Sequence, residues 1–172
     1  MSINEIRPVY ILTTGGTIEK TYDEYDGSLI NRESNTFKLV SKLRLPYKDV
    51  SVETVMQKDS MLMNDSDRLD ILKATQEKLK EKAPIIIIHG TDTMDQTAQY
   101  LYENLKSLEV PIILTGAMRP LEMNGTDAIQ NVIEAIALTD VLGPGVYISF
   151  HSRVFRAPNV KKNKKSKTFE AI

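Results

Sequence analysis

Residues 85–94 read IIIIHGTDTM, and this stretch decides the fold. Four consecutive isoleucines predict a strand that is covered on both faces, as in the middle of a parallel sheet. Residues 9–18, VYILTTGGTI, have the same form: an apolar run followed by threonines and glycines. The carboxyl ends of parallel strands meet at one edge, where ligands bind in open α/β sheets. We therefore expect both polar motifs to line one site.

The rest of the chain alternates between strand and helix patterns. Apolar runs at 110–114 and 146–150 predict two further buried strands, and the alternating run 50–56 predicts a less central one. Apolar residues recur at helical spacing in four segments: 37–43, 64–82, 93–106 and 127–138. This order requires right-handed crossovers. We expect an α/β fold with a doubly wound, mostly parallel sheet flanked by helices, in a single domain spanning residues 1–172.

Two segments depart from this alternation. Residues 20–34 are polar and predict a long loop beside the first motif, of the kind that serves as a lid or binding loop. From about residue 153 the chain is basic, which indicates a solvated and partly disordered tail. A nucleic-acid patch is the alternative for this tail, but the interleaved aromatic residues of single-strand binders are missing. We expect no nucleic-acid partner.

Composition excludes several classes of function. Among 172 residues, 22 lysines and arginines nearly balance 23 aspartates and glutamates, so no general affinity for polyanions follows. The sequence contains no cysteine, which rules out disulfides and thiol catalysis. No apolar run approaches the ~20 residues of a membrane span, and residues 1–8 have no secretory apolar region. We expect a soluble cytoplasmic protein without membrane contact.

The glycine pair Gly15–Gly16 has three interpretations. It could be a turn that lets a helix pack closely, or a phosphate loop, although neither G-x-x-x-x-G-K-[ST] nor G-x-G-x-x-G occurs in the sequence. The third interpretation rests on Thr17, directly after the glycines. Small residues there would expose the Thr17 hydroxyl and leave backbone N–H groups free to hold an anionic intermediate. This third interpretation favours a catalytic site.

The charged and imidazole groups also have structural alternatives. Asp92 could cap the helix that starts near Thr93. His89 is more typical of a hydrogen-bonded structural histidine, and His151 is the only other histidine. No G-x-S-x-G elbow and no H-E-x-x-H pattern is present, so we expect neither a serine triad nor a catalytic metal.

Several short motifs together resemble one family. They are TGGTI at 14–18, DS at 59–60, MND at 63–65, HGTDTM at 89–94, GAMRP at 116–120, and Asp127 with Asn131. In order and spacing, from about residue 8 to the C-terminus, they closely resemble the bacterial-type L-asparaginases and glutaminase-asparaginases. The resemblance implies the fold of their N-terminal domain. It also implies an amidohydrolase that converts L-asparagine to L-aspartate and ammonia without a cofactor.

The resemblance assigns catalytic roles to particular residues. Thr17 corresponds to the nucleophile, which forms an acyl-enzyme that water then hydrolyses. A tyrosine of the flexible loop would assist it, and Tyr22 is the first choice with Tyr25 in reserve. A threonine–aspartate–lysine group would act on protons; it maps to Thr91, Asp92 and Lys162, with Lys161 as the competitor for the lysine.

The resemblance also implies substrate contacts. Asp59, Ser60 and Met61 would face the substrate, with Ser60 holding its α-carboxylate, and Met61 stands where some relatives carry glutamine. Gly16 and Ala117 complete the predicted substrate-binding set, Ala117 through its backbone. Asp92 could in addition receive the substrate's ammonium group.

Length is the largest departure from the family. Its typical members have a second, smaller domain that this chain lacks. The chain could be a natural short asparaginase, a truncated chain or a degenerate relative, and we favour the first. Two other functions remain open: an ammonia-supplying subunit of a tRNA-dependent amidotransferase, and an amino-acid-binding relative that has lost catalysis. On family grounds we expect a homodimer or homotetramer acting on a small molecule.

Overall fold

The structure, a computed structural model, describes residues 5–31 and 34–172. Its main sheet has six strands in the order β4-β1-β5-β6-β7-β8. Neighbouring strands are parallel, except that β8 runs antiparallel to β7. The strands are β1 (Arg7–Gly15), β4 (Lys48–Lys58), β5 (Ile85–Ile88), β6 (Pro111–Thr115), β7 (Gly145–Phe150) and β8 (Arg153–Arg156).

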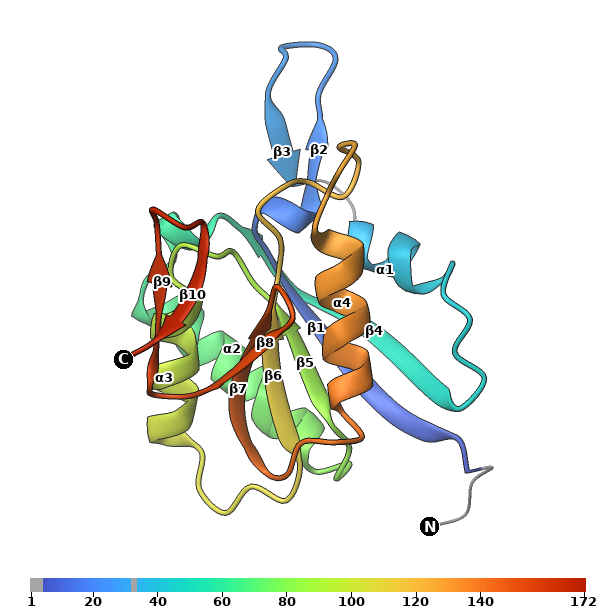
Figure 1. The fold of residues 1–172 in the computed structure, drawn as a ribbon, viewed down its shortest axis with the longest axis vertical. Helices are drawn as coiled ribbons and strands as arrows, with labels where there is room; N and C mark the ends of the chain where they lie inside the picture. The colour runs from blue at the N-terminus through green and yellow to red at the C-terminus, as the bar shows by residue number, and fades with distance from the viewer. Residues whose placement is uncertain (1–4, 32–33) are drawn as a thin grey trace.

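In the described part of the chain, four α-helices cover the two faces of this sheet (Figure 1). They are α1 (Asn35–Val40), α2 (Asp65–Leu79), α3 (Met94–Asn104) and α4 (Ala128–Leu138). Helices α2 and α3 pack on one face, whereas α1 and α4 pack on the other. The predicted doubly wound α/β fold is confirmed. Among the residues that the structure describes, no helix combines the length and the apolar character that a membrane crossing requires.

The isoleucine run explains why β5 lies in the middle. Ile85 and Ile87 belong to the core under α2 and α3, and Ile86 and Ile88 belong to the core under α4. All four side chains are fully buried. Each such burial stabilises the fold by roughly 1.5–3 kcal/mol. A strand between two helical layers needs apolar residues at every position, and this pattern predicts it correctly.

The edge strand and the helix starts also follow from local sequence. Strand β4 alternates between partly buried and exposed residues and lies at the edge of the sheet, which agrees with the prediction of a less central strand. Asn64 caps α2 by accepting from the backbone of Ser66 and Asp67, and Asp67 accepts in return from the Asn64 backbone. This reciprocal arrangement satisfies amide groups that the first turn leaves unpaired.

The segment after the first motif is a hairpin and not the predicted loop. Strand β2 (Lys20–Tyr22) pairs antiparallel with β3 (Leu29–Asn31), and the hairpin projects from the body of the protein (Figure 1). Gly27, with φ 73°, lies in its turn, where the Asp23 backbone carbonyl accepts the Gly27 amide at 2.8 Å. The loop prediction was wrong over these residues, and residues 32–33 lie outside the described part.

The basic tail is also ordered into strands, which corrects the expectation of a solvated end. After β8, strand β9 (Val160–Asn163) pairs antiparallel with β10 (Thr168–Ala171). Phe155, Val160 and Phe169 are buried in the main core. These isolated apolar residues anchor one face of each strand, while the lysines between them face outward or toward the site.

Candidate functional site

The first motif reaches the second through a close backbone contact. Gly15 and Gly16 adopt φ values of 97° and 83°, which side-chain-bearing residues rarely adopt. A Cβ atom on Gly16 would lie 2.5 Å from the Cα of Gly90, and one on Gly15 would lie 2.4 Å from the amide nitrogen of Lys58. The two glycines therefore bring the end of β1 against the second motif and the end of β4.

The same close packing continues to a third segment. A Cβ atom on Gly90 would lie 2.5 Å from the hydroxyl oxygen of Ser60. The hydroxyl of Thr93 donates to the Ser60 carbonyl at 2.9 Å, and that of Thr14 donates to the Ile88 carbonyl at 2.9 Å. Three segments that are distant in sequence thus meet at the carboxyl edge of the sheet. For the two glycine–threonine motifs this position was predicted.

Thr17 opens the short 3-10 helix η1 (Thr17–Glu19) and is partly exposed. Within the described residues, no hydrogen bond joins its hydroxyl to another group. The buried Glu19 carboxylate accepts the backbone amides of Asn35 at 2.6 Å and Thr36 at 3.2 Å, and also the Thr36 hydroxyl. Burial raises the pKa of Glu19 above its ordinary value, although these donors act to lower it. This carboxyl fixes the segment that follows Thr17.

A lysine of the tail closes the second motif. The Lys162 ammonium group donates to the Thr91 hydroxyl at 2.8 Å and to the Asp92 carboxylate at 2.8 Å. The Lys162 side chain is only 11% exposed. Asp92 does not cap α3: that position belongs to Thr93, so the capping interpretation was wrong.

Backbone contacts explain why Lys162 and not Lys161 points inward. The Lys162 amide donates to the Asp95 carboxylate of α3 at 2.9 Å. This bond fixes which side of β9 faces α3. Because neighbouring residues of a strand point to opposite sides, Lys161 faces outward. Its side chain is 56% exposed and pairs with Glu170 at 3.4 Å.

Asp59 and Ser60 lie beside the glycine contacts, at the start of the 3-10 helix η2 (Ser60–Leu62). The Ser60 side chain is buried, and its hydroxyl has no hydrogen-bond partner among the described residues. Asp59 accepts from Lys20 at 2.8 Å and from the Met61 amide at 3.0 Å. The Lys20 contact holds the pKa of Asp59 below its ordinary value. Met61 itself is 72% exposed.

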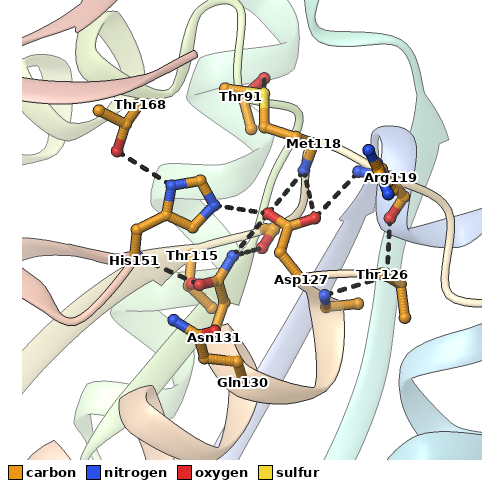
Figure 2. Close-up of polar contacts among 12 residues, drawn as sticks. Thr91, Thr115, Met118, Arg119, Thr126, Asp127, Gln130, Asn131, His151 and Thr168 are labelled. Atoms are coloured by element: carbon orange, nitrogen blue, oxygen red, sulfur yellow. Dashed lines mark hydrogen bonds and ion pairs between the residues drawn. The ribbon is translucent and has the colours of Figure 1, made fainter. Parts of the chain in front are cut away.

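Ala117 lies buried in the loop that follows β6. The Asp127 carboxylate shapes this loop by accepting the amides of Met118 at 2.9 Å and Arg119 at 3.0 Å (Figure 2). Burial opposes the charge, but the donors of Met118 and His151 outweigh it and keep the pKa of Asp127 below its ordinary value. The Ala117 backbone therefore has a fixed position near the second motif.

The predicted loop tyrosines are not brought to Thr17. Tyr22 ends β2 and is 58% exposed, and Tyr25, near the hairpin turn, is 97% exposed. No hydrogen bond joins either phenol to Thr17 in the part of the chain that the structure describes.

His89 is a structural residue in this geometry. It is fully buried; its Nδ1 lies 2.8 Å from the Gly90 carbonyl and its Nε2 lies 2.9 Å from the Thr97 hydroxyl. The carbonyl can only accept, so Nδ1 carries the proton and Nε2 accepts from Thr97. Burial lowers the pKa of His89 to about 4, which keeps the ring neutral.

Sequence reasoning missed three contacts of the site. They are the Lys20 pair with Asp59, the Asp95 contact with the Lys162 amide, and the Thr91 hydroxyl contact with the Met118 sulfur at 3.7 Å. None of them has a local pattern, because each joins segments that the fold alone brings together. Within residues 5–31 and 34–172, no group of three or more acidic or histidine side chains could hold a metal ion.

Fold and site together define an α/β protein with a threonine- and lysine-based site at the carboxyl edge of a parallel sheet. The family described as "Asparaginase, N-terminal" matches residues 8–172. The chain belongs to the asparaginase family.

Relatives and solved structures agree with this assignment. An L-asparaginase of Bacillus licheniformis is 32% identical over 164 residues, covering 91% of this chain and 50% of the relative. The thermostable L-asparaginase from Thermococcus kodakarensis has a solved structure with a TM-score of 0.86 and 27% identity, covering 96% and 51% of the two chains. A glutamyl-tRNA(Gln) amidotransferase subunit of Pyrobaculum aerophilum is 35% identical over 134 residues, 76% of this chain and 31% of the relative. The chain spans about half the length or less of these relatives.

Proposed function

We propose that residues 1–172 act as a single catalytic domain that hydrolyses L-asparagine to L-aspartate and ammonia through Thr17. The observation that carries this proposal is the position of Lys162. Its ammonium group lies 2.8 Å from both the Thr91 hydroxyl and the Asp92 carboxylate while almost withdrawn from solvent. A lysine held in this way can accept or relay a proton.

The chemistry needs such a group because a threonine hydroxyl is a weak nucleophile at its free pKa. In the proposed reaction Lys162 reacts as the free amine. The Thr17 oxygen attacks the side-chain carboxamide carbon, and its proton passes through the Thr91 hydroxyl to the Lys162 nitrogen. The C–N bond then breaks, and ammonia leaves with that proton. Water hydrolyses the resulting ester, which restores the Thr17 hydroxyl and releases L-aspartate. Backbone N–H groups near Gly16 would stabilise the oxyanion.

Substrate recognition in this proposal rests on Ser60 and Asp92. The buried Ser60 hydroxyl has no partner among the described residues, and in this proposal it donates a hydrogen bond to the substrate's α-carboxylate. The Asp92 carboxylate would receive the α-ammonium group. Asp59, fixed by Lys20, and the Ala117 backbone would border the same space. Met61, with its exposed side chain, would contribute through its backbone.

Tyr22 remains the predicted helper of Thr17, with Tyr25 as the alternative. Both lie on the projecting hairpin, so this role requires the hairpin to approach the site when substrate binds. Tyr22→Phe should lower kcat by roughly 10²–10⁴-fold if its hydroxyl transfers a proton. Tyr25→Phe is the matched control, and a larger loss in that variant would reverse the assignment.

Ammonia release from L-asparagine and L-glutamine tests the proposal directly. We expect turnover of asparagine by the wild type and none above background by Thr17→Ala. Lys162→Met should lower kcat by about 10²-fold or more, whereas the adjacent Lys161→Met should keep the wild-type rate. Circular dichroism would check that each variant is folded. Full activity in Thr17→Ala, or equal effects of the two lysine variants, would overturn the assignments.

A second candidate function follows from the Pyrobaculum aerophilum relative. This chain would then deliver ammonia to a synthase acting on tRNA. Co-purification with a partner protein or with tRNA, together with little free turnover, would support that function. A folded wild type that binds L-asparagine without releasing ammonia would instead indicate the silent binding relative. The expected cytoplasmic location stays a prediction, which fractionation of the source cells would test.

A further inference from the structure

The turn between β7 and β8 holds two residues in an unfavourable backbone conformation. His151 and Ser152 have φ values of 49° and 61°, although neither is glycine. The left-handed region costs roughly 1–2 kcal/mol per residue for side-chain-bearing residues. Such conformations persist only where surrounding contacts determine them, and they mark positions worth examining for function.

Helix α4 supplies the contacts that hold the turn. The His151 amide donates to the Asn131 side-chain oxygen at 3.1 Å. The Ser152 amide and hydroxyl donate to the Glu134 carboxylate at 2.8 and 2.7 Å. These bonds fix the backbone and leave the imidazole of His151 to make contacts of its own.

The imidazole bridges two segments (Figure 2). Its Nε2 lies 2.9 Å from the Asp127 carboxylate, and its Nδ1 lies 3.2 Å from the Thr168 hydroxyl. An ionised carboxylate only accepts, so Nε2 carries the proton that it donates to Asp127. The Thr168 hydroxyl can pair with Nδ1 because a hydroxyl both donates and accepts.

Each end of this bridge leads to the proposed catalytic group. On one side, Asp127 also accepts the Met118 amide, and the Met118 sulfur contacts the Thr91 hydroxyl at 3.7 Å. On the other side, Thr168 lies in β10, one residue from Phe169, which is paired across the hairpin with Lys162. Lys162 in turn donates to Thr91, so the contacts form a closed ring.

We propose that His151 is a positioning residue: with Asp127 it joins the loop of Ala117 and Met118 to the β9–β10 hairpin, and so holds Lys162 against Thr91. The kinetic part of this inference rests on the proposed function. The hairpin's other fixed points are the buried side chains of Val160 and Phe169 and the Lys162 amide bond to Asp95. His151 adds a fixed point on the opposite strand from Lys162.

Small displacements of Lys162 should have large effects, because a misplacement of about 1 Å can cost about 10²-fold in rate. His151→Gln retains an N–H donor for Asp127 but lacks the second ring nitrogen that Thr168 uses. Thr168→Val removes the same bond from the other side. We expect each variant to lower kcat about 10-fold with KM little changed. The double variant should be no slower than the slower single variant, because both remove one interaction.

Ser152→Ala is the matched control, because it alters the same turn but leaves the imidazole contacts of His151 in place. It should lower stability without lowering kcat. Multiplicative losses in the double variant, or an equal kcat loss in Ser152→Ala, would overturn the inference.

Hydrogen exchange of the backbone amides in residues 160–171 provides a readout that does not need turnover. His151→Gln and Thr168→Val should exchange several-fold faster there than the wild type, with β5 and β6 unchanged. If the wild type releases no ammonia, the proposed function fails and this measurement alone decides the positioning role. Unchanged exchange in both single variants would refute it in either case.

Discussion

The site can form because residue 16 is a glycine, which has no Cβ atom. Gly16 adopts φ 83° and packs against Gly90, so that the segments carrying Thr17 and Thr91 touch through their backbones. A side chain there would have to displace backbone atoms, which cannot rotate away as a flexible side chain can.

Gly16→Ala should therefore destabilise the protein and remove activity together. We expect a loss of roughly 1–3 kcal/mol in unfolding free energy from backbone strain and overpacking. Urea denaturation with an ammonia assay would measure both effects. Gly143→Ala is the control, because a Cβ atom there would meet nothing within 4 Å. Equal stability of the two variants would show that the close approach at Gly16 is not required.

His89 should make the stability of the protein depend on pH. Its pKa is about 4 when folded and 6.5 as an exposed group, so the unfolded state binds more protons between these values. The contribution of neutral His89 to the unfolding free energy is complete above pH 6.5 and is lost as the pH falls toward 4. At 1.36 kcal/mol per pH unit, the loss between pH 6.5 and 5.0 is about 2 kcal/mol.

Urea unfolding at pH 7.5 and 5.0 would measure this effect. The wild type should lose about 2 kcal/mol more than His89→Gln over this interval, because the amide side chain does not titrate. Every other group is common to both proteins, so the comparison isolates the contribution of His89. Parallel pH dependences would mean that His89 is not buried in its neutral form.

At the scale of elements, the β9–β10 hairpin is the part on which the proposed chemistry depends most. It carries Lys162 on one strand, and the other is anchored by Phe169, which is fully buried and meets Phe150 edge to face at 5.1 Å between centroids. Phe169→Ala should cost about 3–5 kcal/mol of unfolding free energy and should lower kcat. Ile172→Ala, at a 70% exposed position, should change neither. Unfolding and rate measurements on both variants would check this, and an inactive but fully stable Phe169→Ala would contradict the anchoring role.

The same hairpin shows where sequence reasoning stops. Strand β5 is predictable because a strand covered on both faces requires an unbroken apolar run such as Ile85–Ile88. In β9 and β10, only single residues such as Val160 and Phe169 are buried. The lysines between them hide the apolar pattern that would indicate a strand. The β2–β3 hairpin was missed for a related reason: its pairing is between backbone groups, and few of its side chains are buried.

The candidate site also has a part that the sequence predicts and a part that only the fold brings together. Gly16, Thr17, Thr91 and Asp92 are predictable because the chemistry and the strand ends place them in continuous motifs. Contacts such as Lys20 with Asp59 arise between residues 39 positions apart, and no local pattern records them. The contact of Lys162 with Thr91 was expected from the family resemblance, and a basic run alone would not have distinguished it from Lys161.

At the scale of the whole molecule, the residues proposed for catalysis lie at one edge of the sheet, and several of them remain reachable by solvent. Thr17 is partly exposed, and the hairpin with Tyr22 and Tyr25 extends away from the body (Figure 1). Water at an acyl-enzyme is needed for hydrolysis, but a site that excludes bulk solvent strengthens every electrostatic contact within it. In the homodimer or homotetramer expected from the family resemblance, we propose that a neighbouring subunit provides that cover.

This proposal predicts that activity depends on assembly. Light scattering across a range of protein concentrations should give a mass of two or four chains, and dilution below the dissociation constant should lower the mass and kcat per chain together. The physical reason is that separated chains lose the subunit that shields the Thr91–Lys162 contact from water. Thermal unfolding at each concentration is the control, because it separates dissociation from loss of the folded chain. A monomer with constant kcat per chain at all concentrations would contradict the prediction and would mean that this half-length chain encloses its substrate alone.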